Sequence, residues 1–213
     1  MNSNSTNLPI TFFDGDSFAW EIDEDGYLRY RRVLVDPITG EKSFDDNYGY
    51  IYDNHWYYDS DPADIYTENN GREIVISAKT LNSQYGQLPI TVARKIYVSE
   101  DASFVRILDI VTNTSSDDSW NYGFYYDNEL PSLKSKVINT DRGDNNFDKG
   151  DNWVSVNGVY DDELTDNNLS IIQVVAGDGG YRPLSANADG NVNFNHNLEL
   201  EPGETKAVMS FVT

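Results

Sequence analysis

The chain has 213 residues, no cysteine and a formal net charge of −21, with 36 Asp and Glu residues against 15 Lys and Arg. Without cysteine it has no disulfide, no thiolate metal site and no cysteine nucleophile. The acidic field repels phosphate backbones and anionic lipids, so neither a nucleic-acid partner nor membrane insertion is expected.

The length fits one domain, and we expect a polar linker over residues 1–10 followed by a single β-sandwich over residues 11–213. The linker has no basic region followed by an apolar stretch, so it is not a signal peptide. Met1 before this polar segment indicates a domain taken from a longer exported protein. An acidic, cysteine-free composition rich in Asp and Asn is typical of extracellular bacterial proteins, in which calcium replaces disulfides.

Short runs of alternating apolar and polar residues predict strands, and no helical period extends beyond about ten residues. A turn is expected at Asn69-Asn70-Gly71, and one short helical turn at 161–168. The strands are expected at 74–78, 92–98, 104–111, 153–156, 170–175, 192–200 and 207–212. The frequent turns between them favour an all-β fold, a two-sheet antiparallel sandwich with long acidic loops.

Two of these segments allow a more specific interpretation. The run 104–111 is apolar on both faces except for Arg106 and Asp109, which predicts a central strand. Tyr48, Tyr50 and Tyr52 alternate, so their rings share one face of a strand. That face is expected to belong to the core, with a binding platform as the alternative.

The densest acidic segment runs from Asp141 to Asn152 and predicts a calcium-binding loop, because calcium takes six to eight hard oxygen ligands. Asp144, Asn146 and Asp148 have the spacing of an EF-hand loop, although the glycine falls one position late and the downstream Glu is missing. The alternative is a solvated, Asn-rich hairpin loop. The Arg142-Gly143-Asp144 tripeptide is discounted as an adhesion motif, since three-residue matches often arise by chance.

The order of several phrases along the chain resembles supersandwich-type β-sandwich modules of large secreted bacterial proteins, in particular the calcium-dependent peptide-binding domain of RTX adhesins. The phrases are Trp20-x-Ile22 with Gly26, Asn70-Gly71-Arg72-Glu73, 92–98, 104–109 with 112–114, 175–180, 202–205 and 209–211. The resemblance implies a cell-surface location within a larger adhesin, bound Ca²⁺, and the C-terminus of a peptide or surface protein as partner. The chain departs from such modules after Tyr122.

At this departure lies Tyr125-Tyr126-Asp127-Asn128-Glu129, which places oxygen ligands beside two phenols at a strand end. A calcium ion with one open position there could accept a terminal carboxylate, while the tyrosines supply packing and hydrogen bonds. The predicted metal ligands are therefore Asp127, Asp141, Asp144, Asn146, Asp148 and Asp151. The predicted ligand-binding residues are Tyr125, Tyr126, Asn128 and Trp153.

No enzymatic activity is expected. His55 and His196 are the only histidines, both expected to be structural or surface residues, and no Gly-x-Ser-x-Gly elbow is present. Many Asp and Glu residues of so acidic a chain could lie close enough for glycoside hydrolysis by chance, so such pairs are no evidence of this activity. Mutarotase-like and polysaccharide-lyase sandwiches share a related architecture but rely on His, Tyr and Arg on a long concave sheet, of which this chain offers little.

The favoured hypothesis is a calcium-dependent, peptide-binding module of an extracellular bacterial adhesin, monomeric as an isolated domain. One alternative is a carbohydrate-binding module, because calcium and aromatic residues such as Trp56, Trp120 and Trp153 also suit sugars. Another alternative is a structural spacer stapled by calcium.

If calcium binds the folded chain but not the unfolded chain, replacing a chelator with millimolar calcium raises the melting temperature by mass action. The check is thermal unfolding followed in both conditions. An unchanged melting curve would contradict the calcium prediction.

Overall fold

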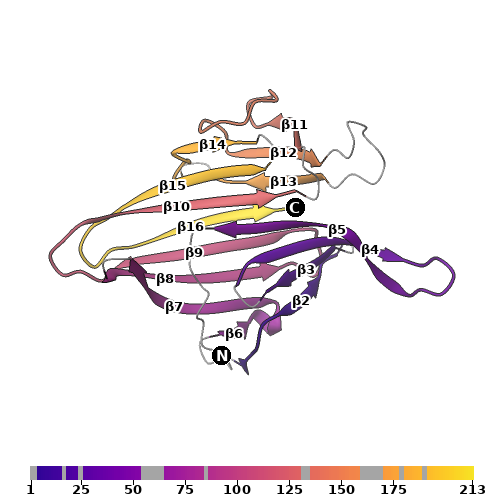
Figure 1. The fold of residues 1–213 in the computed structure, drawn as a ribbon, viewed down its shortest axis with the longest axis horizontal. Coiled ribbons are helices and arrows are strands. Elements are labelled where there is room, and N and C mark those ends of the chain that lie inside the picture. The colour runs from indigo at the N-terminus through magenta and orange to yellow at the C-terminus, as the bar shows by residue number, and fades with distance from the viewer. Residues whose placement is uncertain are drawn as a thin grey trace.

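The computed structural model describes residues 4–15, 18–23, 26–53, 65–83, 86–130, 135–158, 170–177, 180–188 and 191–213. Their strands form two antiparallel sheets, which confirms the predicted all-β sandwich (Figure 1). Among these residues, no helix is long and apolar enough to cross a membrane. The helical turn predicted at 161–168 lies outside them, as do His55 and Trp56.

The larger sheet has nine strands among the described residues, in the order β1-β6-β7-β8-β9-β16-β13-β12-β11. Their bounds are β1 Asn4–Ser5, β6 Ile65–Glu68, β7 Glu73–Ser83, β8 Gly86–Val98, β9 Val105–Asn113, β16 Thr205–Val212, β13 Ser170–Val174, β12 Trp153–Gly158 and β11 Ser135–Thr140. Most of the predicted strands fall in this sheet, and the predicted central strand is β9, the fifth of the nine. The β1 strand lies within the segment predicted as a linker.

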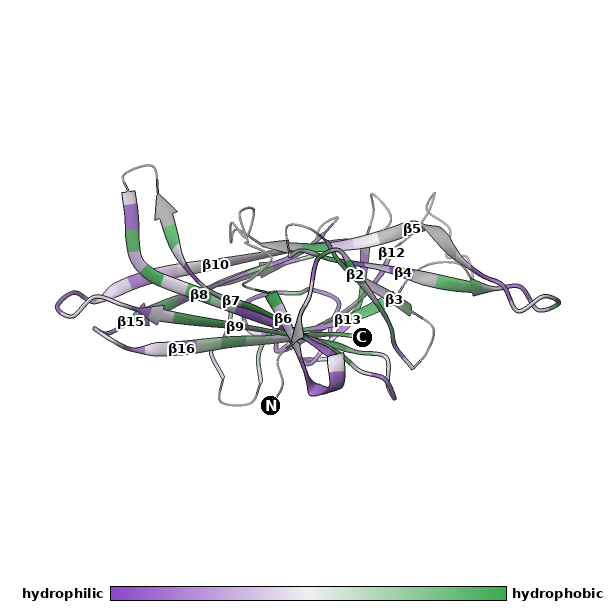
Figure 2. Cartoon of the chain, turned by 90° about the horizontal axis from the view of Figure 1, so that it is seen from below, coloured by the Kyte–Doolittle hydropathy of each residue, from purple (hydrophilic) through white to green (hydrophobic). Residues whose placement is uncertain are grey.

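The smaller sheet has seven described strands in the order β14-β15-β10-β5-β4-β3-β2. Their bounds are β14 Ser185–Asn187, β15 Val192–Leu200, β10 Trp120–Glu129, β5 Lys42–Asp53, β4 Leu28–Val35, β3 Phe18–Ile22 and β2 Ile10–Phe13. The predicted strand at 192–200 is β15. The β4–β5 hairpin projects at one end of the molecule, and the β7–β8 hairpin bends away at the other (Figure 2).

The turn predicted before β7 is a 3-10 turn over Asn69–Gly71. All three residues have positive φ angles, at 49°, 58° and 85°. Asn and Gly tolerate this left-handed conformation better than other residues do, which explains why this sequence turns here. The turn places Asn69 and Asn70 at the end of the larger sheet, beside the start of β7.

Alternation along β8 and β9 sends one set of side chains between the sheets and the other set outward. Arg94 and Asp109 are register partners that both point inward. They form a buried bidentate ion pair, with Nε–Oδ1 and Nη2–Oδ2 distances of 2.8 and 2.9 Å. Tyr126 of the smaller sheet donates a hydrogen bond to the same carboxylate. The pair is thus satisfied inside the sandwich, as a buried charge requires.

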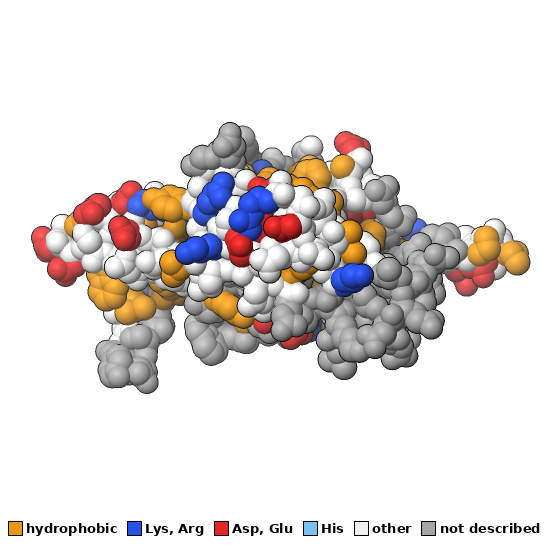
Figure 3. Space-filling model, turned by 90° about the horizontal axis from the view of Figure 1, so that it is seen from above, with side chains coloured by type: hydrophobic (Ala, Val, Ile, Leu, Met, Phe, Trp, Pro, Cys, Tyr) orange, Lys and Arg blue, Asp and Glu red, His pale blue; other side chains and the backbone are white. Residues whose placement is uncertain are grey.

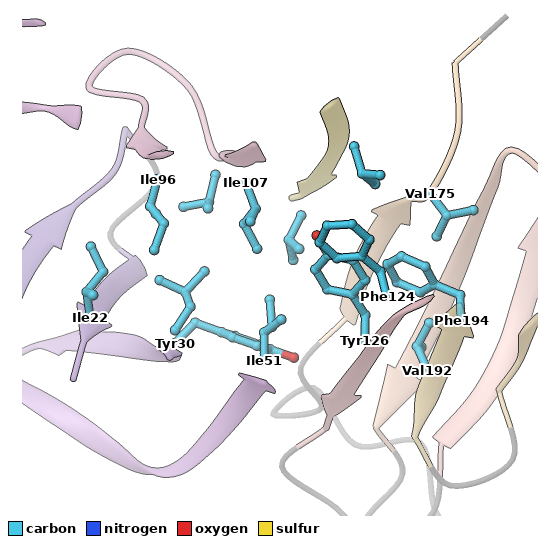
Figure 4. Packing of buried hydrophobic residues seen from close by; sticks show 14 of the residues in the cluster. Ile22, Tyr30, Ile51, Ile96, Ile107, Phe124, Tyr126, Val175, Val192 and Phe194 are labelled. Carbon is cyan, nitrogen blue, oxygen red and sulfur yellow. The ribbon is translucent and has the colours of Figure 1, made fainter. Parts of the chain in front are cut away.

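A second polar bridge also joins the sheets. The Tyr30 hydroxyl donates to Asn128 over 2.8 Å, and the Asn128 amide donates to Gln173 of β13 over 3.0 Å. Tyr30 fits only because its partner across the β4–β5 pair is Gly49, where any Cβ would overlap the Tyr30 ring. Around these bridges lies the hydrophobic core, whose labelled members point into the space between the sheets (Figure 4).

His196 lies in this core rather than at the surface. It points inward from β15 with 2% of its area exposed, and its ring packs edge-on against Phe194 at 5.8 Å. Burial lowers the pKa of His196 to about 4, and the backbone of Arg182 and Val175 offsets this only in part. The ring is therefore neutral in the folded protein at neutral pH, which matches the structural role expected from the sequence.

Because the folded pKa of His196 is below the ordinary value near 6.5, the unfolded chain takes up a proton first as the pH falls. The stability associated with the neutral ring is present above pH 6.5 and decreases toward pH 4. Between pH 7.5 and pH 5 we expect the free energy of unfolding to fall by about 2 kcal/mol more in the wild type than in His196→Gln. Urea unfolding of both proteins at both pH values checks this; equal losses would show that His196 does not titrate in this way.

Candidate functional site

The acidic loop between β11 and β12 is organised around an arginine from its own sequence. The Arg142 guanidinium lies 2.8 Å from Asp148 and 2.8 Å from Asp151, whose side chain is fully buried. Hydrogen bonds from Arg142 lower the pKa of Asp148. Burial opposes ionisation of Asp151, but hydrogen bonds from Arg142 and the Asp148 amide outweigh it and lower the pKa of Asp151. A Cβ at Gly150 would lie 2.8 Å from Arg142, so glycine leaves room for the guanidinium.

The other predicted ligands in this loop make local contacts. Asp144 accepts hydrogen bonds from the Thr140 hydroxyl and the Asn146 backbone N–H, and Asp141 accepts one from the Asn152 side chain. Seen from the side where β11 and β12 lie, basic side chains gather near the middle of the face with acidic ones among them (Figure 3). In the described part of the chain, no group of three or more His, Asp or Glu residues could hold a metal ion. Calcium binding stays a prediction.

The predicted residues on β10 do not form one site. Tyr126 and Asn128 are both 1% exposed and belong to the polar bridges between the sheets. Tyr125 points the other way, is 40% exposed, and donates a hydrogen bond to Asn193 over 3.0 Å. Asp127 is buried on the same strand. The structure thus places the β10 residues in the smaller sheet and Trp153 in the larger one.

Trp153 belongs to a line of side chains that crosses the outer face of the larger sheet, which we call the transverse row. Directly opposed residues of an antiparallel sheet point to the same face. Successive register partners form the row across β7, β8, β9, β16, β13 and β12: Glu73, Tyr97, Arg106, Phe211, Val174 and Trp153. Their chain neighbours Ile96, Ile107, Val154 and Val212 are at most 1% exposed and point inward. The row therefore faces outward.

A cavity of about 560 Å³ opens at the β7–β9 end of the transverse row. It is lined by Asn69, Asn70, Arg72, Tyr97, Glu100, Asp101 and Arg106. The 3-10 turn supplies the two asparagines, and the β8–β9 turn supplies the two carboxylates. These segments are far apart in the sequence and meet only because β6–β7 and β8–β9 are adjacent in the sheet.

Arg72 fixes one wall of this cavity. Its guanidinium donates to the carbonyl oxygens of Val98, Ser99 and Phe13 over 3.0, 2.7 and 2.9 Å. Its positive charge also lies 5.5 Å from the centre of the Phe12 ring. These contacts join β2 of the smaller sheet to the end of β8, so Arg72 acts as a positioning residue for the cavity.

Arg106 and Tyr97 line the opposite wall, and two phenylalanine rings lie next to Tyr97 in turn, outside the lining residues. Arg106 pairs with Glu73, which also accepts a 2.7 Å hydrogen bond from Asn69, and its guanidinium lies 5.4 Å from the centre of the Tyr97 ring. Phe104 lies 6.1 Å from Tyr97 and 6.0 Å from Phe211, measured between ring centres. The wall thus combines the Tyr97 ring with the Arg106 guanidinium, whose charge is compensated by Glu73.

The cavity combines ring surface with polar groups that are not already used. Among the described residues, the Asn70 amide, the Tyr97 hydroxyl and the carboxylates of Glu100 and Asp101 have no side-chain hydrogen-bond or ion-pair partner. From the sequence, Tyr97 and Arg106 were predicted to lie in strands and were not predicted to belong to a site. The sequence contained one indication of such a role: both residues carry polar groups and alternate with the apolar, inward-pointing residues of their strands.

Comparison with solved structures shows a galactose mutarotase-like β-sandwich fold. A candidate aldose 1-epimerase from Escherichia coli K12 has a TM-score of 0.56 at 10% identity, covering 96% of this chain and 98% of that protein. A galactose mutarotase-like protein from Lactobacillus casei has a TM-score of 0.52 at 12% identity, covering 96% and 99%. Neither a protein-family model nor a curated protein sequence matches the chain.

These findings correct the sequence-based resemblance. The assignment to the calcium-dependent peptide-binding domain of RTX adhesins was wrong, because the fold similarity is to mutarotase-like proteins. The adhesin function inferred from that resemblance is withdrawn with it. The related architecture of mutarotase-like sandwiches, noted from the sequence, is the fold that the chain has, since nearly the whole length of both chains aligns.

The loop geometry predicts that Arg142→Gln destabilises the protein, because it leaves the buried Asp151 carboxylate without its cation. Lys149→Gln is the matched control, since Lys149 is an exposed cation of the same loop. Melting curves at neutral pH are expected to show a clear decrease for Arg142→Gln and almost none for the control. Similar curves for both variants would show that the pair with Asp151 contributes nothing.

Proposed function

We propose that this protein is a carbohydrate-binding domain built on a mutarotase-like sandwich, with the cavity beside Tyr97 and Arg106 as its sugar site. The observation that carries this proposal is the juxtaposition of the Tyr97 ring, which packs near Phe104, with amide, hydroxyl and carboxylate groups around one cavity. A sugar presents C–H faces that pack on aromatic rings and hydroxyl groups that hydrogen-bond to planar polar side chains.

The charges of the cavity favour a neutral sugar. Arg106 is compensated by Glu73, and Glu100 and Asp101 would oppose an anionic ligand. A hydroxyl group, in contrast, can donate to these carboxylates and accept from the Asn70 amide. The mutarotase-like fold of the similar structures supports a sugar ligand, although the polar groups that would hold it here are this chain's own.

The domain is proposed to bind sugar without converting it. Glycoside hydrolysis requires two carboxyl groups on opposite sides of the scissile bond. Glu100 and Asp101 are consecutive residues of a single turn, and Glu73 is already engaged by Arg106 and Asn69. His196, the one histidine in the described part of the chain, lies between the sheets and does not line the cavity.

The test is retention of the protein on an array of neutral glucose, galactose, mannose and xylose glycans, from monosaccharides to hexasaccharides. Retention is expected in the wild type and is expected to fall at least tenfold in Tyr97→Ala, which removes ring surface and a hydroxyl. Tyr181→Ala, which removes a 53% exposed tyrosine outside the cavity, serves as the control and is expected to bind normally.

Two outcomes would overturn the proposal: no retention on any glycan, or equal retention by wild type and Tyr97→Ala. NMR of anomer exchange in glucose and galactose, with and without protein, tests the absence of turnover separately. Exchange faster than the protein-free rate would show an enzyme.

A further inference from the structure

The transverse row continues across the sheet beyond the cavity. From Tyr97 the transverse row passes Arg106, Phe211 and Val174 before it reaches Trp153. These are four strand spacings, or roughly 19 Å, because adjacent strands lie about 4.8 Å apart. A single monosaccharide in the cavity cannot reach Trp153 over this span.

The part of the row beyond the cavity is apolar. Phe211 and Val174 are half-buried register partners, and Trp153 is a half-buried partner of Val174. Beside them, two residues along their strands, Met209 is 47% exposed and Ile172 is 39% exposed. Strand alternation places both on the same outer face. An apolar strip therefore joins the cavity to Trp153.

Trp153 itself has a free polar group as well as a large apolar surface. Within the described residues, its indole N–H donates to no protein atom, and its ring contacts no other aromatic ring. A tryptophan that served only the core would point inward, as its neighbour Val154 does with 0% exposure. The indole is thus available to pack on one face of a ligand and to donate to a hydroxyl group.

The strip has no uncompensated charge. Arg106 is paired with Glu73, and the remaining members between Tyr97 and Trp153 are apolar. In a chain with a net charge of −21, such a neutral strip suits an uncharged ligand, while anionic glycans are repelled by the rest of the molecule. A strip with an aromatic residue at each end, Tyr97 and Trp153, offers two stacking surfaces to an extended neutral glycan.

We propose that the ligand is a neutral oligosaccharide or polysaccharide chain lying along the transverse row, with one sugar unit in the cavity at Tyr97 and Arg106 and a distant unit stacked on Trp153. This inference rests on the proposed function and adds to it a second binding subsite and the ligand class. It gives Trp153 a role that depends on the length of the glycan.

The test measures affinity against chain length, using the mono- to hexasaccharides of the neutral series retained on the array and isothermal titration calorimetry. In the wild type the affinity is expected to rise with length until the chain spans the row. Trp153→Ala is expected to weaken hexasaccharide binding roughly three- to tenfold, the effect of losing one aromatic contact, and to leave monosaccharide binding unchanged. Tyr181→Ala is the control and is expected to preserve both affinities.

Trp153→Phe keeps a ring on the strip and is expected to lie between wild type and Trp153→Ala, which keeps the test informative if the alanine variant does not fold. Melting curves of each variant establish that it is folded. If monosaccharides and hexasaccharides bind equally, or if Trp153→Ala weakens both by the same factor, the second subsite is excluded while the sugar site in the cavity stands. If no glycan of any length binds, the proposed function fails first.

Discussion

The buried ion pair between Arg94 and Asp109 is the constraint on which the rest of the larger sheet depends. The two residues are directly opposed on β8 and β9, at most 3% of either side chain is exposed, and the carboxylate also accepts a hydrogen bond from Tyr126 of the other sheet. A slip of one residue would turn one charge outward and leave the other buried without a partner. The pair therefore fixes the register of these two strands.

This register determines what the outer face displays. Tyr97 lies three residues after Arg94, and Arg106 lies three residues before Asp109, so both point to the opposite side of the sheet from the ion pair. They become partners in the transverse row, and β16, β13 and β12 extend the line to Trp153. The polar interior of the sandwich and the proposed sugar-binding surface are two consequences of one alignment.

Much of the architecture could be predicted because it depends on local pattern. Alternation located β7, β8, β9, β12, β13, β15 and β16, and the Asn69-Asn70-Gly71 sequence located a turn that needs positive φ angles. The phrases that suggested an adhesin module are mostly these same strands and the Pro202-Gly203 turn. Such phrases describe what any antiparallel sandwich needs and carry little information about the ligand.

The site could be predicted only in part, because it depends on pairings between segments that are distant in the sequence. Trp153 was selected as a ligand-binding residue, but its neighbours in the row come from five other strands, and no spacing along the chain reveals that alignment. In the acidic loop, the number of carboxylates suggested a calcium site. The sequence did not show that Arg142, within the same segment, pairs with both Asp148 and Asp151. Tyr126 and Asn128 were predicted to bind a ligand, and the sequence does not show that they form the hydrogen bonds that bridge the two sheets.

The lengths of the outermost described strands have a consequence for how the molecule behaves among copies of itself. β1 has two residues, β14 three and β2 four, while β11 is interrupted by an irregularity between Val137 and Asn139. Short or bulged edge strands offer few consecutive backbone hydrogen-bonding groups to a strand of another molecule, so they disfavour edge-to-edge sheet extension and aggregation. The edges of both sheets thus disfavour the addition of a strand from another molecule, although the outer face of the larger sheet carries an apolar strip.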